Sequence, residues 1–134
     1  MVINGNCWDC NRKIKISVGQ SVYDKELYWH AEYSCPYCDS ATSADYGGIP
    51  PEEIRQAILG AEGRWNLNVQ EAGSRAIAVA KVLRKVLGLS LNEAMELKNK
   101  MPGLLFSGTK AEMDRLRQIL ISDRFNAWID QLPF

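Results

Sequence analysis

Four cysteines, arranged as two Cys-x-x-Cys pairs, constrain the fold of this 134-residue chain more than any other feature. Cys7 and Cys10 form the first pair, and Cys35 and Cys38 form the second, two dozen residues later. Each pair can aim two sulfur atoms at one point, so that two pairs supply the four thiolates of a closed tetrahedral Zn²⁺ site. The spacing therefore predicts one structural zinc ion, whose binding is coupled to the folding of the first part of the chain.

Two disulfides or four free thiols are the alternative interpretation of the cysteines. The N-terminus shows neither the basic nor the apolar region of a secretory signal, and no apolar run is long enough to span a bilayer. We therefore expect a cytoplasmic protein without membrane contact, in a reducing compartment that disfavours disulfides. Redox catalysis is not expected either, because neither pair opens a helix that follows a strand.

The segment between the two pairs predicts a β-hairpin. Residues 13–18 and 27–33 alternate polar and apolar side chains, and Gly19 is expected to end the first strand. A hairpin that carries metal ligands at its ends resembles a zinc ribbon, which we assign to residues 1–45. His30 could be a ligand or a general base, but four cysteines already saturate zinc, so we expect an ordinary strand side chain.

Aromatic side chains crowd the predicted ribbon. They are Trp8, Tyr23, Tyr28, Trp29, Tyr33 and Tyr37. Some must cover the small metal core, and the others could form a surface for a protein partner, for which Tyr28 and Trp29 are the candidates. The sequence leaves this division open. Stacking on nucleic acid is a third option, but residues 1–50 carry four basic and six acidic side chains, which argues against it.

Residues 46–63 are predicted to form a linker and a short helix. The small polar residues 39–48 indicate the linker. Proline and glutamate at positions 50–53 favour a helix start, an apolar stripe follows, and Gly60 and Gly63 are expected to end the helix.

Residues 64–134 predict a second domain of mixed α/β (α+β) class, with the order β-α-α-β-α-β. Strands are expected near 65–70, 104–106 and 125–129, although helix is also possible for the last segment. Ser74 is expected to cap the first helix, and Gly88 to end it in a left-handed conformation. Capping boxes begin the other two helices at Ser90 and Thr109. The second helix is expected to bury Leu91, Ala94, Met95 and Leu97.

The segment 78–94, with its basic helix, Gly-Leu turn and capping box, carries a specific resemblance. Together with Pro102 and the Gly108-Thr109 pair, it makes residues 65–130 similar to the C-terminal domain of the bacterial ribosomal stalk protein L7/L12. The resemblance implies a compact domain that binds proteins. In that family, basic residues of the first two helices and the Gly-Leu turn contact translational GTPases.

Lys81 and Arg84 occupy matching positions, and with Lys85 they are the candidate partner-binding residues of this domain. A solvated helix face is the alternative interpretation of these three side chains. Asn92 and Met95 stand where the family usually has lysines, and the dimerisation helices and hinge of the stalk protein are replaced by the ribbon. These departures argue against a stalk protein.

No catalytic motif is visible: the chain has no Gly-rich phosphate loop before a helix, no Gly-x-Ser-x-Gly and no His-Glu-x-x-His. We therefore expect a monomeric, non-catalytic protein-binding module with zinc as its cofactor. Such bacterial proteins resemble immunity proteins, so the first expected partner is a cognate toxin, with toxins that act on translation as the favoured class. A translation-associated factor that binds a GTPase or the ribosome is the alternative, and a zinc-ribbon adaptor in transcription or proteolysis is the third.

Overall fold

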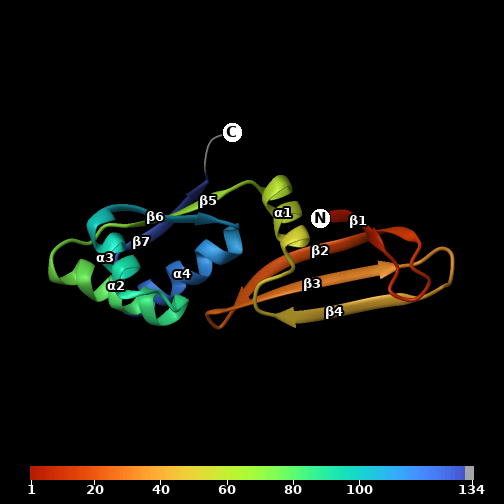
Figure 1. Ribbon diagram of the computed structural model, residues 1–134, viewed down its shortest axis with the longest axis horizontal. Helices are drawn as coiled ribbons and strands as arrows, with labels where there is room; N and C mark the ends of the chain where they lie inside the picture. Colours follow the sequence, from red (N-terminus) through yellow and green to blue (C-terminus); the bar gives the residue numbers. More distant parts are fainter. Residues whose placement is uncertain (132–134) are drawn as a thin grey trace. The chain divides into compact units, whose positions relative to one another are not determined.

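The computed structural model describes residues 1–131 and shows a mixed α/β protein with two antiparallel sheets and four helices (Figure 1). The chain divides into two compact units, Met1–Glu62 (unit 1) and Gly63–Phe134 (unit 2). Within the described part of the chain, no helix combines the length and the apolar character needed to cross a membrane.

Unit 1 contains a four-stranded antiparallel sheet in the order β1-β2-β3-β4. Its strands are β1 (Val2–Asn6), β2 (Lys13–Tyr23), β3 (Glu26–Ser34) and β4 (Ala41–Gly47). The predicted hairpin is confirmed as β2 and β3, but β2 does not end at Gly19. It continues to a two-residue turn at Asp24 and Lys25, whose φ angles of 50° and 64° are those of the turns that fit the twist of a hairpin.

Gly19 has a role in the sheet rather than in a turn. It pairs with His30 across β2 and β3, and a Cβ atom added at Gly19 would lie 2.3 Å from Cε1 of His30. Glycine at this position therefore makes room for the imidazole ring, which lies over the strand. His30 is a strand side chain, and the cysteine cluster does not include it.

The predicted linker at residues 39–48 is wrong, because most of it forms the edge strand β4. This strand pairs with β3 along its whole length, from Ala41 opposite Ser34 to Gly47 opposite Tyr28. Tyr46 stacks on Trp29 with ring centroids 4.3 Å apart. Alternate residues of β4 are only half-buried, so small polar side chains can occupy these positions. The sequence therefore lacks the alternating apolar residues that would have predicted a strand.

The sheet of unit 1 buries one face and exposes the other. The buried cluster consists of Cys7, Ile14, Ile16, Val18, Ala31, Tyr33 and Cys35. Helix α1 (Glu52–Glu62) adds Ile54 to this cluster and belongs to unit 1. Two of the four cysteines are thus part of the core, which connects the cysteine-bearing loops to the packing of the sheet.

Unit 2 has the predicted order β-α-α-β-α-β. The elements are β5 (Trp65–Val69), α2 (Ser74–Leu87), α3 (Leu91–Lys100), β6 (Gly103–Gly108), α4 (Lys110–Ser122) and β7 (Ala127–Gln131). The sheet order is β6-β5-β7, and the three helices lie along one face of it (Figure 1). The last segment, for which strand and helix were both open, is a strand; residues 132–134 lie outside the described part of the chain.

Helix ends in unit 2 follow the sequence signals with one exception. Ser90 and Thr109 both form reciprocal capping boxes, with Glu93 and Glu112 respectively. Gly88 ends α2 in the left-handed region and donates its N–H to the carbonyl of Arg84. Ser74 does not cap α2: Gly73 occupies the N-cap position, and no side chain bonds there.

The burial predicted for α3 is wrong at two of four positions. Ala94 and Leu97 are buried, but Leu91 is 61% exposed and Met95 is 56% exposed. The reason is geometric, since a ten-residue helix on the outside of a small domain turns only one narrow stripe toward the core. Leu91 and Met95 are one turn apart and form a separate stripe that faces away from it.

Two glycines provide a matched test of these backbone assignments. Gly88 has φ +65°, whereas Gly60 lies inside α1, and a Cβ atom would meet nothing at either position. We predict that Gly88→Ala lowers the free energy of unfolding by about 1 kcal/mol, because alanine is strained in the left-handed region. Gly60→Ala should raise it by about 0.5 to 1 kcal/mol through helix propensity. Urea denaturation measures the free energy of unfolding of both variants. Changes of the same sign in the two variants would contradict the assignments.

Candidate metal centre

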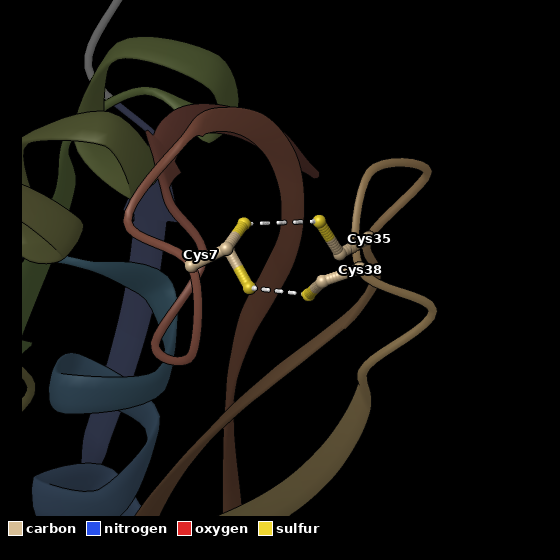
Figure 2. A group of neighbouring side chains, drawn as sticks. Cys7, Cys35 and Cys38 are labelled. Atoms are coloured by element: carbon tan, nitrogen blue, oxygen red, sulfur yellow. Dashed lines mark hydrogen bonds between the residues drawn. The ribbon is translucent and has the colours of Figure 1, made fainter.

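The four cysteine side chains meet at one point in unit 1. All four Sγ atoms lie within 4.8 Å of one another. Figure 2 shows sulfurs of the two Cys-x-x-Cys turns facing each other, with Cys7 Sγ 3.7 Å from Cys38 Sγ, and Cys10 Sγ is likewise 3.7 Å from Cys35 Sγ. A tetrahedral site with Zn–S bonds of about 2.3 Å has sulfur–sulfur edges of about 3.8 Å. The cluster could therefore hold one metal ion, and its donor set and size suit zinc.

The two Cys-x-x-Cys loops reach this arrangement through the same local fold. The N–H of Cys7 donates to the carbonyl of Arg12 at 2.9 Å, and the N–H of Cys35 donates to that of Ser40 at 2.7 Å. Four residues after each first cysteine, Asn11 and Asp39 have φ angles of 61° and 58°. Asparagine and aspartate tolerate this left-handed conformation better than other residues with side chains. Each loop is thus closed by a backbone hydrogen bond between its first cysteine and the residue five positions later.

Tyr33 supports the first loop from the neighbouring strand. Its hydroxyl oxygen accepts the backbone N–H of Trp8 at 3.0 Å and lies 3.9 Å from Cys7 Sγ. The ring of Trp8 packs edge-on against the Tyr33 ring, with centroids 5.7 Å apart. Tyr33 is buried and therefore holds both the backbone and the first sulfur of this loop in place.

Ser40 connects the second loop to the first. Its hydroxyl oxygen accepts a hydrogen bond from Cys38 Sγ at 3.3 Å, and its hydroxyl group donates to the carboxylate of Asp9. Tyr33 is one of the six aromatic residues predicted to cover the metal core or to contact a partner, whereas Ser40 and Asp9 were not predicted to support the site. Tyr33 had a detectable signal, because it lies two residues before Cys35 and side chains two apart on a strand share a face; the other two had none.

The environment of the cluster shifts the thiol pKa values in opposite directions. The backbone N–H of Cys10, bonded to the sulfur, lowers the pKa of Cys7 to about 6. The hydroxyl of Ser40 lowers the pKa of Cys38. For Cys10, a bond from the Arg12 backbone favours the thiolate, but burial and the neighbouring thiols outweigh it and raise the pKa to about 11. Metal binding must then displace a proton from Cys10, so that metal affinity rises with pH.

The chemistry open to this centre is structural. Four sulfur ligands complete a tetrahedral shell and leave no position for water or substrate. Zinc held here would fasten the loop between β1 and β2 to the loop between β3 and β4. It would thereby connect parts of the sheet that are far apart in the sequence.

The candidate partner-binding residues do not all lie together. Tyr28 and Trp29 are neighbours in β3 and therefore point to opposite faces of the sheet, with Trp29 on the face of the buried cluster. In unit 2, Lys81, Arg84 and Lys85 are all exposed. Their spacing of three and four residues places them on the same outer side of α2.

Replacing the hydroxyl of Tyr33 tests its supporting role. We predict that Tyr33→Phe lowers zinc affinity by about tenfold, because the Trp8 N–H and the Cys7 sulfur lose their partner while the ring is kept. Competition with a chromophoric chelator measures the affinity.

Tyr37→Phe is the matched control, since its ring lies under Arg12 and a phenyl ring preserves that contact. It should leave zinc affinity within about twofold of the unmodified chain. If both variants bind zinc like the unmodified chain, the Tyr33 hydroxyl does not support the site.

No protein-family model matches the chain, and no curated protein or solved structure matches it either.

Proposed function

We propose that this chain is a non-catalytic protein-binding module in which a zinc ion holds unit 1 together and unit 2 presents the main contact surface. In its most specific form the proposal is a bacterial immunity protein that binds a cognate toxin and neutralises it. The exposed apolar stripe of α3, beside a basic helix face, is the observation that carries the protein-binding part.

Large apolar side chains on α2 and α3 point outward instead of joining the core. Leu91 and Met95 on α3 and Ile77 on α2 are all exposed. Ile77 lies one turn before Lys81, so an apolar and a basic side chain share the outer side of α2. Exposed apolar groups rimmed by polar residues are typical of protein contact sites. We name Ile77, Lys81, Arg84, Leu91 and Met95 the α2–α3 surface.

The turn between the two helices is held in one conformation. Arg84 donates from Nε to the carbonyl of Leu89 at 3.2 Å, and the N–H of Leu89 donates to the carbonyl of Arg84 at 3.0 Å. Ser90 then caps α3. A surface that is ordered before binding loses less conformational entropy when a partner docks, which favours affinity.

The immunity hypothesis assigns this surface to a toxin. It is supported by the resemblance of such bacterial proteins to immunity proteins, and by the closed four-sulfur geometry, which suits a scaffold rather than a reaction centre. Unit 2 resembles a domain family whose members contact translation factors, so a toxin that acts on translation would be a suitable partner. The partner is then a bacterial protein that binds tightly and is inactivated.

A second function is favoured by Lys81 and Arg84. Both are exposed on α2, and they match the basic positions through which the stalk family contacts translational GTPases. In this alternative the chain recruits a GTPase, and unit 1 contacts the ribosome. Met95 argues for a changed specificity, because an apolar side chain replaces a lysine of that family.

Affinity purification from the native host, followed by mass spectrometry, tests the proposal. We predict that one protein is captured in near-equal amount to the tagged chain, and that Lys81→Glu with Arg84→Glu lowers its recovery at least about tenfold, as loss of charged contacts at an interface centre does. Under the immunity hypothesis, expression of the captured protein alone arrests growth, and co-expression of this chain restores it.

The matched control reverses two charges in the last turn of α3, as Lys98→Glu with Lys100→Glu. It imposes the same charge change on unit 2 but leaves the α2–α3 surface intact, so recovery of the partner should be unaffected. Capture of GTPases or ribosomes without growth protection would refute the immunity hypothesis and leave the alternative. Equal loss in both variants would place the interface outside the α2–α3 surface.

A further inference from the structure

Unit 1 contains a groove that the metal centre does not use. It has a volume of about 480 Å³ and lies between the buried face of the sheet and the first turn of α1. Trp8 and Trp29 line it together with Ile16 and Ile54, and Glu53 adds a carboxylate. All residues that line it come from unit 1. The groove thus combines an apolar floor, two indole rings and one negative charge.

Both indole rings are held in place by the surrounding structure. Trp29 stacks on Tyr46 with an angle of 20° between the ring planes. The side chain of Trp8 is 57% exposed. Its backbone N–H nevertheless donates to the Tyr33 hydroxyl, and its ring packs against the Tyr33 ring. An exposed tryptophan that is fixed at both backbone and ring is an ordered surface for a ligand, and tryptophan is among the residues that dominate protein contacts.

The charge around the groove favours a cation. Glu53 is the one charged residue among the described residues that line it. Unit 1 as a whole carries five basic and nine acidic side chains, a formal net charge of −4. A cation placed over an indole face is attracted by the negative π surface, and tryptophan is the best aromatic partner for it.

Other aromatic rings of the chain already have cations of their own. Arg12 lies over Tyr37, Lys110 over Trp65 and Arg75 over Phe125, each about 5 Å from the ring centroid. In the described residues no such cation lies over Trp8 or Trp29. These two rings form, together with Glu53, a site whose chemistry matches a positive group. Glu53 also borders a second pocket, which is lined by Lys13 and Lys15.

We propose that this groove, bounded by Trp8, Trp29 and Glu53, binds a lysine or arginine side chain of a protein partner. The aliphatic stem of that side chain packs on Ile16 and Ile54, and its charged head lies against the indole rings and the Glu53 carboxylate. The inference rests on the protein-binding function proposed above and adds a second contact, on unit 1, with a basic segment of the partner.

Short peptides test the site directly on the intact, zinc-loaded chain. The probes are acetyl-Ala-Arg-Ala-amide, its lysine analogue, and neutral versions that carry citrulline or leucine at the central position. We expect the two cationic peptides to shift the indole N–H resonances of Trp8 and Trp29, with a dissociation constant on the order of millimolar. The indole signals of Trp65 and Trp128, which belong to unit 2, should not move.

Variants separate the contributions of ring and charge. Glu53→Gln and Trp8→Ala should each weaken binding of the arginine peptide by about threefold to tenfold. Tyr23→Ala is the matched control, because Tyr23 is an exposed aromatic of the same unit at the far end of β2 and does not line the groove. It should leave the affinity unchanged. Zinc content of each variant is measured alongside, so that loss of fold is distinguished from loss of contact.

Equal shifts with the citrulline or leucine peptide would overturn the proposal and leave an apolar groove without charge selectivity. Unchanged affinity in Glu53→Gln would overturn it as well. The peptide assay is independent of the partner purified from the host. If peptides fail while a protein is still captured through the α2–α3 surface, the groove assignment is wrong and the protein-binding function stands. If the peptides bind and no protein is captured, the groove assignment stands and the protein-binding function is wrong.

Discussion

The convergence of four sulfur atoms is the constraint on which the rest of unit 1 depends. Cys7 and Cys35 are buried within the apolar cluster of unit 1, and the loops that carry them connect β1 to β2 and β3 to β4. A unit of this size buries too little apolar surface for a large stability margin. Metal bound by the four cysteines would therefore add the stability that packing alone does not provide, and the Tyr33 hydroxyl would link the metal centre to the Trp8 loop.

Unit 2 is stabilised in a different way. Its core consists of apolar side chains from all three strands and all three helices, and the helix ends are fixed by capping boxes and by Gly88. Near the N-terminus of α2, Glu71 forms an ion pair with Arg75 at 2.8 Å, and Arg75 also donates to the carbonyl of Arg124. The bond from Arg75 lowers the pKa of Glu71. No part of this arrangement requires a metal.

The sequence predicted the parts of the fold that depend on local chemistry. The capping boxes and the left-handed Gly88 act within a few residues, and the structure confirms them. The two Cys-x-x-Cys pairs are far apart in the sequence, and the structure brings their four sulfur atoms together as their spacing predicted. Strand β4 and the exposure of Leu91 and Met95 were not predicted, because they depend on which neighbour a segment packs against. The groove at Trp8 and Trp29 was only partly foreseen: the sequence indicated aromatic residues for a partner, but only the fold shows which of them share a face.

Removal of the metal tests the central claim most directly. The purified chain should contain about one zinc per molecule. After addition of a strong chelator, the backbone amide resonances of unit 1 should collapse to the narrow range of an unfolded chain, and those of unit 2 should keep their positions. Readdition of zinc should restore unit 1. A metal-free chain in which unit 1 keeps its dispersed resonances would contradict the account.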